Sequence, residues 1–196
     1  MNHASASATL AALLVAAAVA GCTSVAVMSH VPITTVSRLS ALKLTNIDPE
    51  QLRVAARLPE MLEPRPDGVK VRVDVKSSAV HAASTLEFIL EAVIDPVELA
   101  LLSAHRRAGS QLWVYRLSPR DIERLRRLIA VRGDAPGVSI AAGVDACRLN
   151  PLGSAALPTT TFLRTDATGF FVLAEDLDLR GVVSERDLAT KIPACL

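Results

Sequence analysis

The alternation of hydrophobic and charged residues is clearest at residues 69–76, where four valines alternate with four charged side chains. Successive side chains of a β-strand point to opposite faces, so this pattern predicts a strand with one buried and one solvated face. A strand of this kind is typical of an antiparallel sheet that is exposed to water on one side. By their hydrophobic pattern we expect further strands at 52–57, 86–94, 111–117 and 138–149. We also expect a strand at 36–47, with a helix as the alternative.

Glycine, proline and small polar residues predict where the strands turn or are interrupted. Residues 166–169 predict the tight turn of a hairpin between strands at 159–165 and 170–174. Gly143 indicates a bulge within the strand at 138–149. The cluster Pro64-Arg65-Pro66-Asp67-Gly68 predicts a turn ahead of the valine-rich strand.

Two helices are predicted by the residues at their starts. Asp95-Pro96 and Ser118-Pro119 each place a side chain that can cap a helix before a proline, which is favoured in the first helical turn. We expect these helices at about 96–108 and 119–131, each followed by a glycine that can end it. In the second helix, apolar residues recur at the spacing of one buried face.

Two other segments have weaker helical patterns. Residues 48–51 have the residue types of a helix start, but Pro59 follows too soon for a full helix. We therefore expect a single helical turn before the strand at 52–57. The carboxyl-terminal segment 176–194 is expected to form a short helical turn and coil.

Together these elements predict an α+β domain, with a largely antiparallel sheet and two main helices at about 96–108 and 119–131. A β-sandwich with helical insertions is the alternative. The two similar helix starts also leave a βαβαβ unit open, although one repetition does not make a repeat array.

The amino-terminal segment follows a different pattern. Residues 10–20 form an uninterrupted apolar run of 11 residues, which suits the hydrophobic region of a signal peptide and is too short to span a bilayer. Small residues then precede Cys22. The sequence Val19-Ala20-Gly21-Cys22 resembles the lipobox of bacterial lipoproteins, whose cysteine is linked to diacylglycerol and becomes the mature amino terminus. The resemblance covers this segment alone.

One feature departs from that family's pattern. Signal peptides carry Lys or Arg before the apolar run, whereas here only His3 precedes it and the first such residue is Arg38. Either export tolerates this or the start codon is misplaced. The alternatives to a lipoprotein are an uncleaved membrane helix over residues 10–28 and an ordinary secreted protein.

The resemblance implies a division of the chain and a location. Residues 1–21 would be the signal peptide, 22–35 a tether and 36–196 a single globular domain, with the lipid attached at Cys22. The protein would be anchored in the cell envelope with its domain on the periplasmic or extracytoplasmic side. Thr23, in place of Asp, would favour the outer membrane if the organism has one.

Composition and charge limit the class of partner. The chain has 21 Lys and Arg against 20 Asp and Glu, and its net charge of +1 gives no reason to expect a nucleic acid as partner. Aromatic residues make up 3% of the chain, so platforms for stacking bases or sugars are not expected.

Charge is unevenly distributed around the second predicted helix. Residues 105–132 contain eight Arg against two acidic residues, whereas residues 166–187 are acidic. Arg120, Arg124 and Arg127 are therefore a candidate basic contact face for anionic headgroups or an acidic partner. The alternative is a solvated helix face that the acidic segment partly neutralises.

Two cysteines, Cys147 and Cys195, remain beyond the lipobox. Export to an oxidising compartment predicts that they form a disulfide, which would hold the carboxyl terminus to the domain. Two unpaired thiols are the alternative.

We find no pattern of residues that indicates catalysis. His30, His81 and His105 lack the spacing of a metal site, and Leu152-Gly153-Ser154-Ala155 is interpreted as a loop. No cofactor is expected. We therefore expect a non-catalytic binding or assembly module with an unknown envelope protein as partner. An auxiliary subunit of an envelope transport system and an enzyme with an unrecognised site are the alternatives.

Overall fold

The computed structural model describes residues 32, 35, 43–77, 82–132 and 138–195. Among them, seven strands form one sheet in the order β5-β2-β3-β4-β1-β6-β7, and every neighbouring pair is antiparallel. The strands are β1 Arg53–Pro59, β2 Leu62–Val75, β3 Ser84–Ala92, β4 Ser110–Leu117, β5 Val138–Arg148, β6 Pro158–Thr165 and β7 Gly169–Asp178. The predicted antiparallel sheet is confirmed. The possibility of a βαβαβ unit is wrong, because such a unit requires parallel strands.

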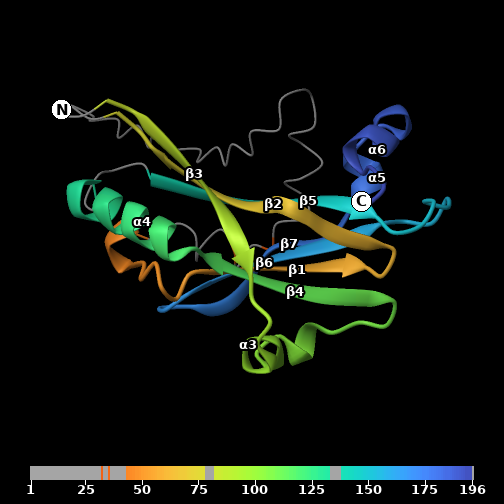
Figure 1. Ribbon diagram of the computed structural model, residues 1–196, viewed down its shortest axis with the longest axis horizontal. Coiled ribbons are helices and arrows are strands. Elements are labelled where there is room, and N and C mark those ends of the chain that lie inside the picture. The colour runs from red at the N-terminus through yellow and green to blue at the C-terminus, as the bar shows by residue number, and fades with distance from the viewer. Residues whose placement is uncertain (1–31, 33–34, 36–42, 78–81, 133–137, 196) are drawn as a thin grey trace, which may run out of the picture.

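Short helices surround a sheet that curls into a half-barrel (Figure 1). The α-helices are α3 Pro96–Ala100, α4 Pro119–Arg132, α5 Leu179–Val182 and α6 Glu185–Lys191, and Leu44–Asn46 and Ser103–His105 form the 3-10 helices η1 and η2. α4 lies at one end of the curled sheet and α5 and α6 at the other, while α3 lies outside β4. The core is therefore built mainly by the sheet.

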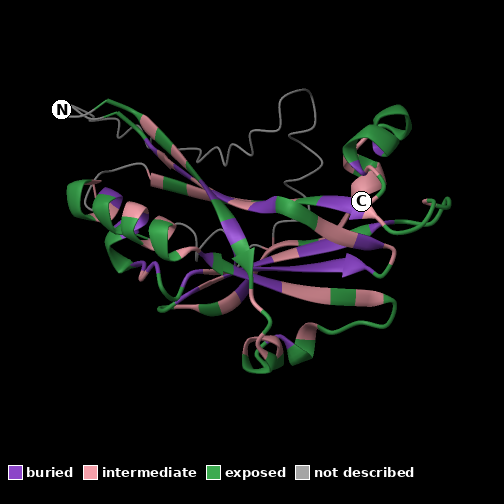
Figure 2. Ribbon diagram, in the orientation of Figure 1, coloured by how far each residue is buried: buried purple, intermediate pink, exposed green. Residues whose placement is uncertain are grey.

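The predicted helix at 119–131 is confirmed as α4. Its start has the expected cap, because the Ser118 hydroxyl accepts a hydrogen bond from the Asp121 backbone N–H at 3.1 Å. Leu125 and Leu128 are buried against the concave face of the sheet, in a cluster that also contains Val71 and Phe88. Figure 2 shows α4 with one buried side and one exposed side.

The predicted helix at 96–108 is wrong in its second half. α3 ends at Ala100, and the chain turns so that Leu102 is completely buried. Leu102 packs with Val114 and Phe162 on the convex face of the sheet. A regular helix through residue 108 would carry the chain past this site, so burial of one leucine overrides the local helical pattern.

The predicted turn at residues 64–68 is wrong, because this cluster lies within β2. Arg65–Gly68 form a bulge in which four residues of β2 face Asp145 alone on β5. A Cβ atom at Gly68 would lie 2.7 Å from the backbone oxygen of Asp145, so the close approach of the two strands requires glycine there. The bulge predicted at Gly143 is also wrong, because Gly143 pairs in regular register with Lys70.

Predictions near the two ends of the domain have mixed outcomes. The strand at 36–47 is wrong in its described part, since Leu44–Asn46 is a 3-10 helix, and residues 36–42 lie outside the described residues. The single turn at 48–51 and the following strand are confirmed. The hairpin of β6 and β7 is confirmed, with Gly169 at a positive φ of 61°.

The carboxyl-terminal segment is more regular than expected. β7 continues to Asp178, and α5 and α6 follow it. Leu188 and Ile192 from this segment cover Leu58 and Leu62 at one end of the sheet. The last residues then run beside β5.

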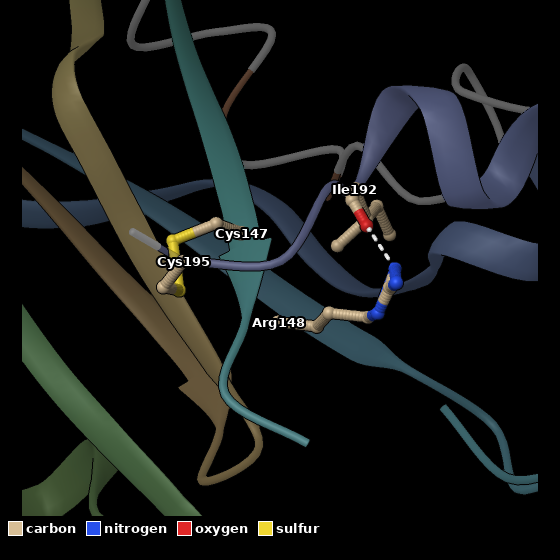
Figure 3. Close-up of a disulfide and its surroundings, with 4 residues drawn as sticks. All are labelled: Cys147, Arg148, Ile192 and Cys195. Carbon is tan, nitrogen blue, oxygen red and sulfur yellow. Dashed lines mark hydrogen bonds between the residues drawn. A yellow bond between two sulfur atoms is a disulfide. The ribbon is translucent and has the colours of Figure 1, made fainter. Parts of the chain in front are cut away.

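A disulfide fixes this end of the chain to the sheet (Figure 3). Cys147 and Cys195 are bonded, with 5.0 Å between their Cα atoms. Arg148 supports the same attachment, because its backbone N–H donates to the Pro193 carbonyl and its carbonyl accepts from the Cys195 N–H, at 2.8 and 2.9 Å. The Arg148 side chain also donates to the Ile192 carbonyl at 3.2 Å.

Replacing Cys195 with Ser should lower the free energy of unfolding by about 4 kcal/mol, because the bond restricts a long loop of the unfolded chain. The bonded cysteines are separated by 48 positions in the sequence. Denaturant unfolding of the wild type and Cys195→Ser measures the difference, and reduced wild type serves as the control that should match the variant. Equal unfolding midpoints for the oxidised wild type and the variant would contradict this assignment.

Candidate functional site

The sheet divides where β3 meets β4. Residues Ser84–Ile89 of β3 pair with β2, but β4 pairs with β3 only at Leu90–Ala92. The chain leaves β4 after Leu117 because Ser118 and Pro119 begin α4. Within the described part of the chain, β3 therefore has a ladder partner on one side only over Ser84–Ile89. Such an edge presents backbone groups that another strand can pair with.

An open groove of about 1400 Å³ lies along this division. It is lined by the end of β3, the bulged part of β2, the start of α4 and the carboxyl-terminal residues. The side chains that line the groove include Glu63, Glu87, Ile89, Glu91, Tyr115, Arg120 and Arg124. The disulfide also lines the groove, so the bond that fixes the carboxyl terminus helps to shape its wall.

The structure brings two of the three predicted basic contact residues to this groove. Arg120 is exposed at the first turn of α4, and Arg124 follows one turn later. The Arg124 guanidinium donates to Asp121 at 2.6 Å and lies 5.0 Å from the centroid of the Phe88 ring. Arg124 is therefore held in place by neighbours from both sides. Arg127 is exposed but is not among the residues that line the groove.

Acidic residues of β3 also line the groove. Glu87 and Glu91 are exposed on β3, and Lys70 lies 3.6 Å from Glu87. Burial raises the pKa of the Tyr115 hydroxyl to about 12, and the negative charge of Glu63 adds to that rise. Like an ordinary tyrosine, Tyr115 keeps its proton at neutral pH and can donate a hydrogen bond. The groove thus combines side chains of both charges with the exposed aliphatic side chain of Ile89.

Other residues singled out in the sequence lie elsewhere. Cys22, His30 and His81 are outside the described residues. The backbone carbonyl of His105 accepts a hydrogen bond from Arg57, and its ring centroid is 4.8 Å from that of Phe162. In the described ranges, no group of three His, Cys, Asp or Glu side chains is arranged to hold a metal ion.

The segment 152–155 is a loop held by one arginine. Arg180 donates to the carbonyl of Ala155 at 2.8 Å and to that of Gly153. Its guanidinium also forms an ion pair with Glu185 at 2.6 Å. A smaller cavity of about 520 Å³ lies beside this loop. The contacts of Arg180 account for the loop's position.

The sequence did not indicate the buried charges on the convex face. Arg57 is buried on β1 and donates to the His105 carbonyl at 2.9 Å, to Thr160 at 2.8 Å and to Asp176 at 2.5 Å. These contacts hold the end of η2 against the sheet. The available signal was the alternation in β1, where Arg57 shares a face with the buried Ala55.

Comparison with known proteins gives no assignment. Within the described residues, every helix is too short or too polar to span a bilayer. No family model matches the chain, and neither a curated protein nor a solved structure is similar to it.

Proposed function

We propose that the protein is a lipid-anchored cell-envelope protein whose groove binds an extended segment of another envelope protein. It would act as a binding or assembly module, with no reaction of its own. The observation that supports this most directly is the one-sided pairing of β3 over Ser84–Ile89, next to a groove of about 1400 Å³.

The groove has the features that strand addition requires. Backbone groups on the open edge of β3 would supply hydrogen bonds that do not depend on the partner's sequence. Ile89, whose side chain is 46% exposed, offers an apolar contact beside that edge. Glu87 and Glu91 on β3 and Arg120 on α4 would select the partner's orientation through charge.

The lipid anchor rests on the lipobox and on the length of the tether. Thr35 is buried and its hydroxyl donates to the Val172 carbonyl, so the chain reaches the sheet by residue 35. The segment between Cys22 and Thr35 can span about 45 Å when fully extended. The domain would therefore stay close to the membrane, on the periplasmic or extracytoplasmic side, and at the outer membrane where one exists.

We assign the domain to the α+β class, with the β-sandwich as the alternative. The assignment is supported by α4, whose Leu125 and Leu128 belong to the largest core cluster together with residues of several strands. In a sandwich the two sheet faces would fill the core between them.

A photoreactive amino acid at position 89 should form a discrete covalent adduct with one partner protein in intact cells, because Ile89 lies in the groove. The same substitution at Val131 is the matched control, since Val131 is 64% exposed on α4 and does not line the groove. Adducts are compared by gel electrophoresis and identified by mass spectrometry. Absence of an adduct at 89, or the same adduct at 131, would count against the groove as the binding site.

Replacing Cys22 with Ser should release the protein from membranes, because no other residue of the lipobox can receive the diacylglycerol group. Membrane fractionation measures the release, and the intact mass of the wild type should show a cleaved and acylated chain. Cys147→Ser is the control, since it removes a cysteine of the disulfide and leaves the anchor in place. If Cys22→Ser stays with the membranes as the wild type does, lipid anchoring at Cys22 is wrong.

A further inference from the structure

The short helix α3 and the residues beside it have the reverse of the usual polarity. Ile94, Val97 and Leu101 are 98%, 69% and 56% exposed. Val97 and Leu101 are four positions apart and share one side of α3, and Ile94 lies just before the helix cap at Asp95. We call these three residues the apolar ridge. The charged residue between them, Glu98, points the other way, and its side chain is only 12% exposed. A surface helix normally turns its apolar side chains to the core and its charges to water.

Ion pairs hold α3 in this orientation. The Glu98 carboxylate accepts hydrogen bonds from Arg53 on β1 at 3.1 Å and from Arg164 on β6 at 2.6 and 3.1 Å. Both arginine side chains are only 13% exposed, so rotation of α3 would leave two nearly buried charges without a partner. The fold therefore presents the apolar ridge to the outside as a fixed feature.

The adjoining residues reinforce this attachment. Leu99 and the fully buried Leu102 pack into the cluster on the convex face of the sheet. At the other end, the Asp95 carboxylate accepts a hydrogen bond from the Val97 N–H at 2.8 Å and caps the helix. The packing of Leu99 and Leu102 on the sheet and the cap at Asp95 thus hold the ridge in place.

The size of the ridge argues against a protein as its main occupant. A stable protein interface buries about 800 Å² on each partner and depends on large anchors such as Trp, Tyr and Arg. Three aliphatic side chains offer far less area, and no aromatic residue belongs to the ridge. A lipid surface imposes no such requirement, because its contact with a protein grows simply with the apolar area inserted.

Charge beside the ridge fits an anionic lipid surface. Arg106 and Arg107 follow η2 directly and are exposed. Arg107 shares Asp176 with the buried Arg57, at 3.2 Å, while Arg106 has no ion pair among the described residues. Basic residues next to an inserted apolar side chain add attraction to negative headgroups.

The tether reaches the domain at β7, the last strand of the sheet. Thr35 donates to the carbonyl of Val172, and the Val172 side chain packs in the cluster that contains Leu99 and Leu102. An anchor at Cys22 would hold the domain near the bilayer, since the tether spans at most about 45 Å. Because the anchor makes the second contact intramolecular, a weak apolar contact is sufficient.

We propose that the apolar ridge of Ile94, Val97 and Leu101 inserts into the headgroup region of the membrane that carries the lipid anchor. This inference rests on the anchoring at Cys22 in the proposed function. The ridge and the tether then give the domain two points of attachment, which fix its orientation on the membrane. The groove beside β3, whose wall reaches Ala92, is held at a constant height above the lipid as a result.

The test uses the full lipidated chain with one added cysteine, labelled with an environment-sensitive fluorophore. Val97→Cys reports on the ridge and Val131→Cys is the matched control, since both valines are exposed and lie on helices. Each protein is reconstituted into vesicles of phosphatidylglycerol and phosphatidylethanolamine that contain a quencher on the lipid chains. Quenching at position 97 should exceed that at 131 by about threefold or more, because only the ridge enters the lipid.

A second variant separates insertion from mere proximity. Ile94→Ser with Leu101→Ser should abolish the excess quenching at position 97, while far-ultraviolet circular dichroism shows that the fold is kept. Vesicle flotation and intact mass report on the lipid anchor independently. If the protein floats with the vesicles but positions 97 and 131 are quenched equally, the ridge proposal alone is wrong.

Two further outcomes would also overturn the proposal. If the protein carries no lipid and does not float, the anchor and the ridge proposal both fail. If the label at 97 is shielded only in native membranes and not in pure lipid vesicles, the occupant is a protein and the lipid assignment is wrong.

Discussion

Pairing of β3 with β4 over only three residues, Leu90–Ala92, is the constraint on which the architecture depends. It joins β5-β2-β3 to β4-β1-β6-β7 in one continuous sheet, and no longer ladder connects the two parts at this point. The pairing stops at Leu117 because Ser118 and Pro119 start α4 there. The helix then fills the concave side, and among the described residues no second strand pairs with β3 over Ser84–Ile89, beside the groove. The helix start at Ser118 thus determines both where α4 packs in the core and where the pairing of β3 with β4 ends.

Buried charges balance the reversed polarity on the other face. Glu98 lies between Arg53 and Arg164, and Arg57 contacts Asp176, so these arginines are neutralised as they lose water. Removing one partner of such an ion pair would leave a buried charge without compensation. The resulting loss of folding free energy would be larger than the stabilisation that the intact pair provides. The same ion pairs turn Val97 and Leu101 outward. An arrangement that stabilises the sheet therefore also creates an exposed apolar surface.

Sequence patterns predicted what depends on neighbouring residues. The valine alternation of β2, the cap at Ser118 and the turn before Gly169 all act within a few positions, so they were visible without the fold. Cys147 and Cys195 could be paired because two thiols remained beyond the lipobox. The groove could not be predicted, because the residues that line it come from segments far apart in the chain.

The bulge at Arg65–Gly68 also depends on a distant residue, Asp145. The predicted length of the helix at 96–108 was wrong, because Leu102 is buried in a cluster of residues from distant strands and the helix ends before it.

Amide hydrogen exchange along β3, measured by nuclear magnetic resonance on the purified full chain, tests the open edge most directly. In an antiparallel strand, successive amides point to opposite sides. Within Ser84–Ile89, amides directed at β2 should exchange slowly and those directed at the groove should exchange rapidly, in alternation. At Leu90–Ala92 the amides that face β4 should be protected as well. Slow exchange at every amide of Ser84–Ile89 would show that the edge is closed and would contradict the proposed binding edge.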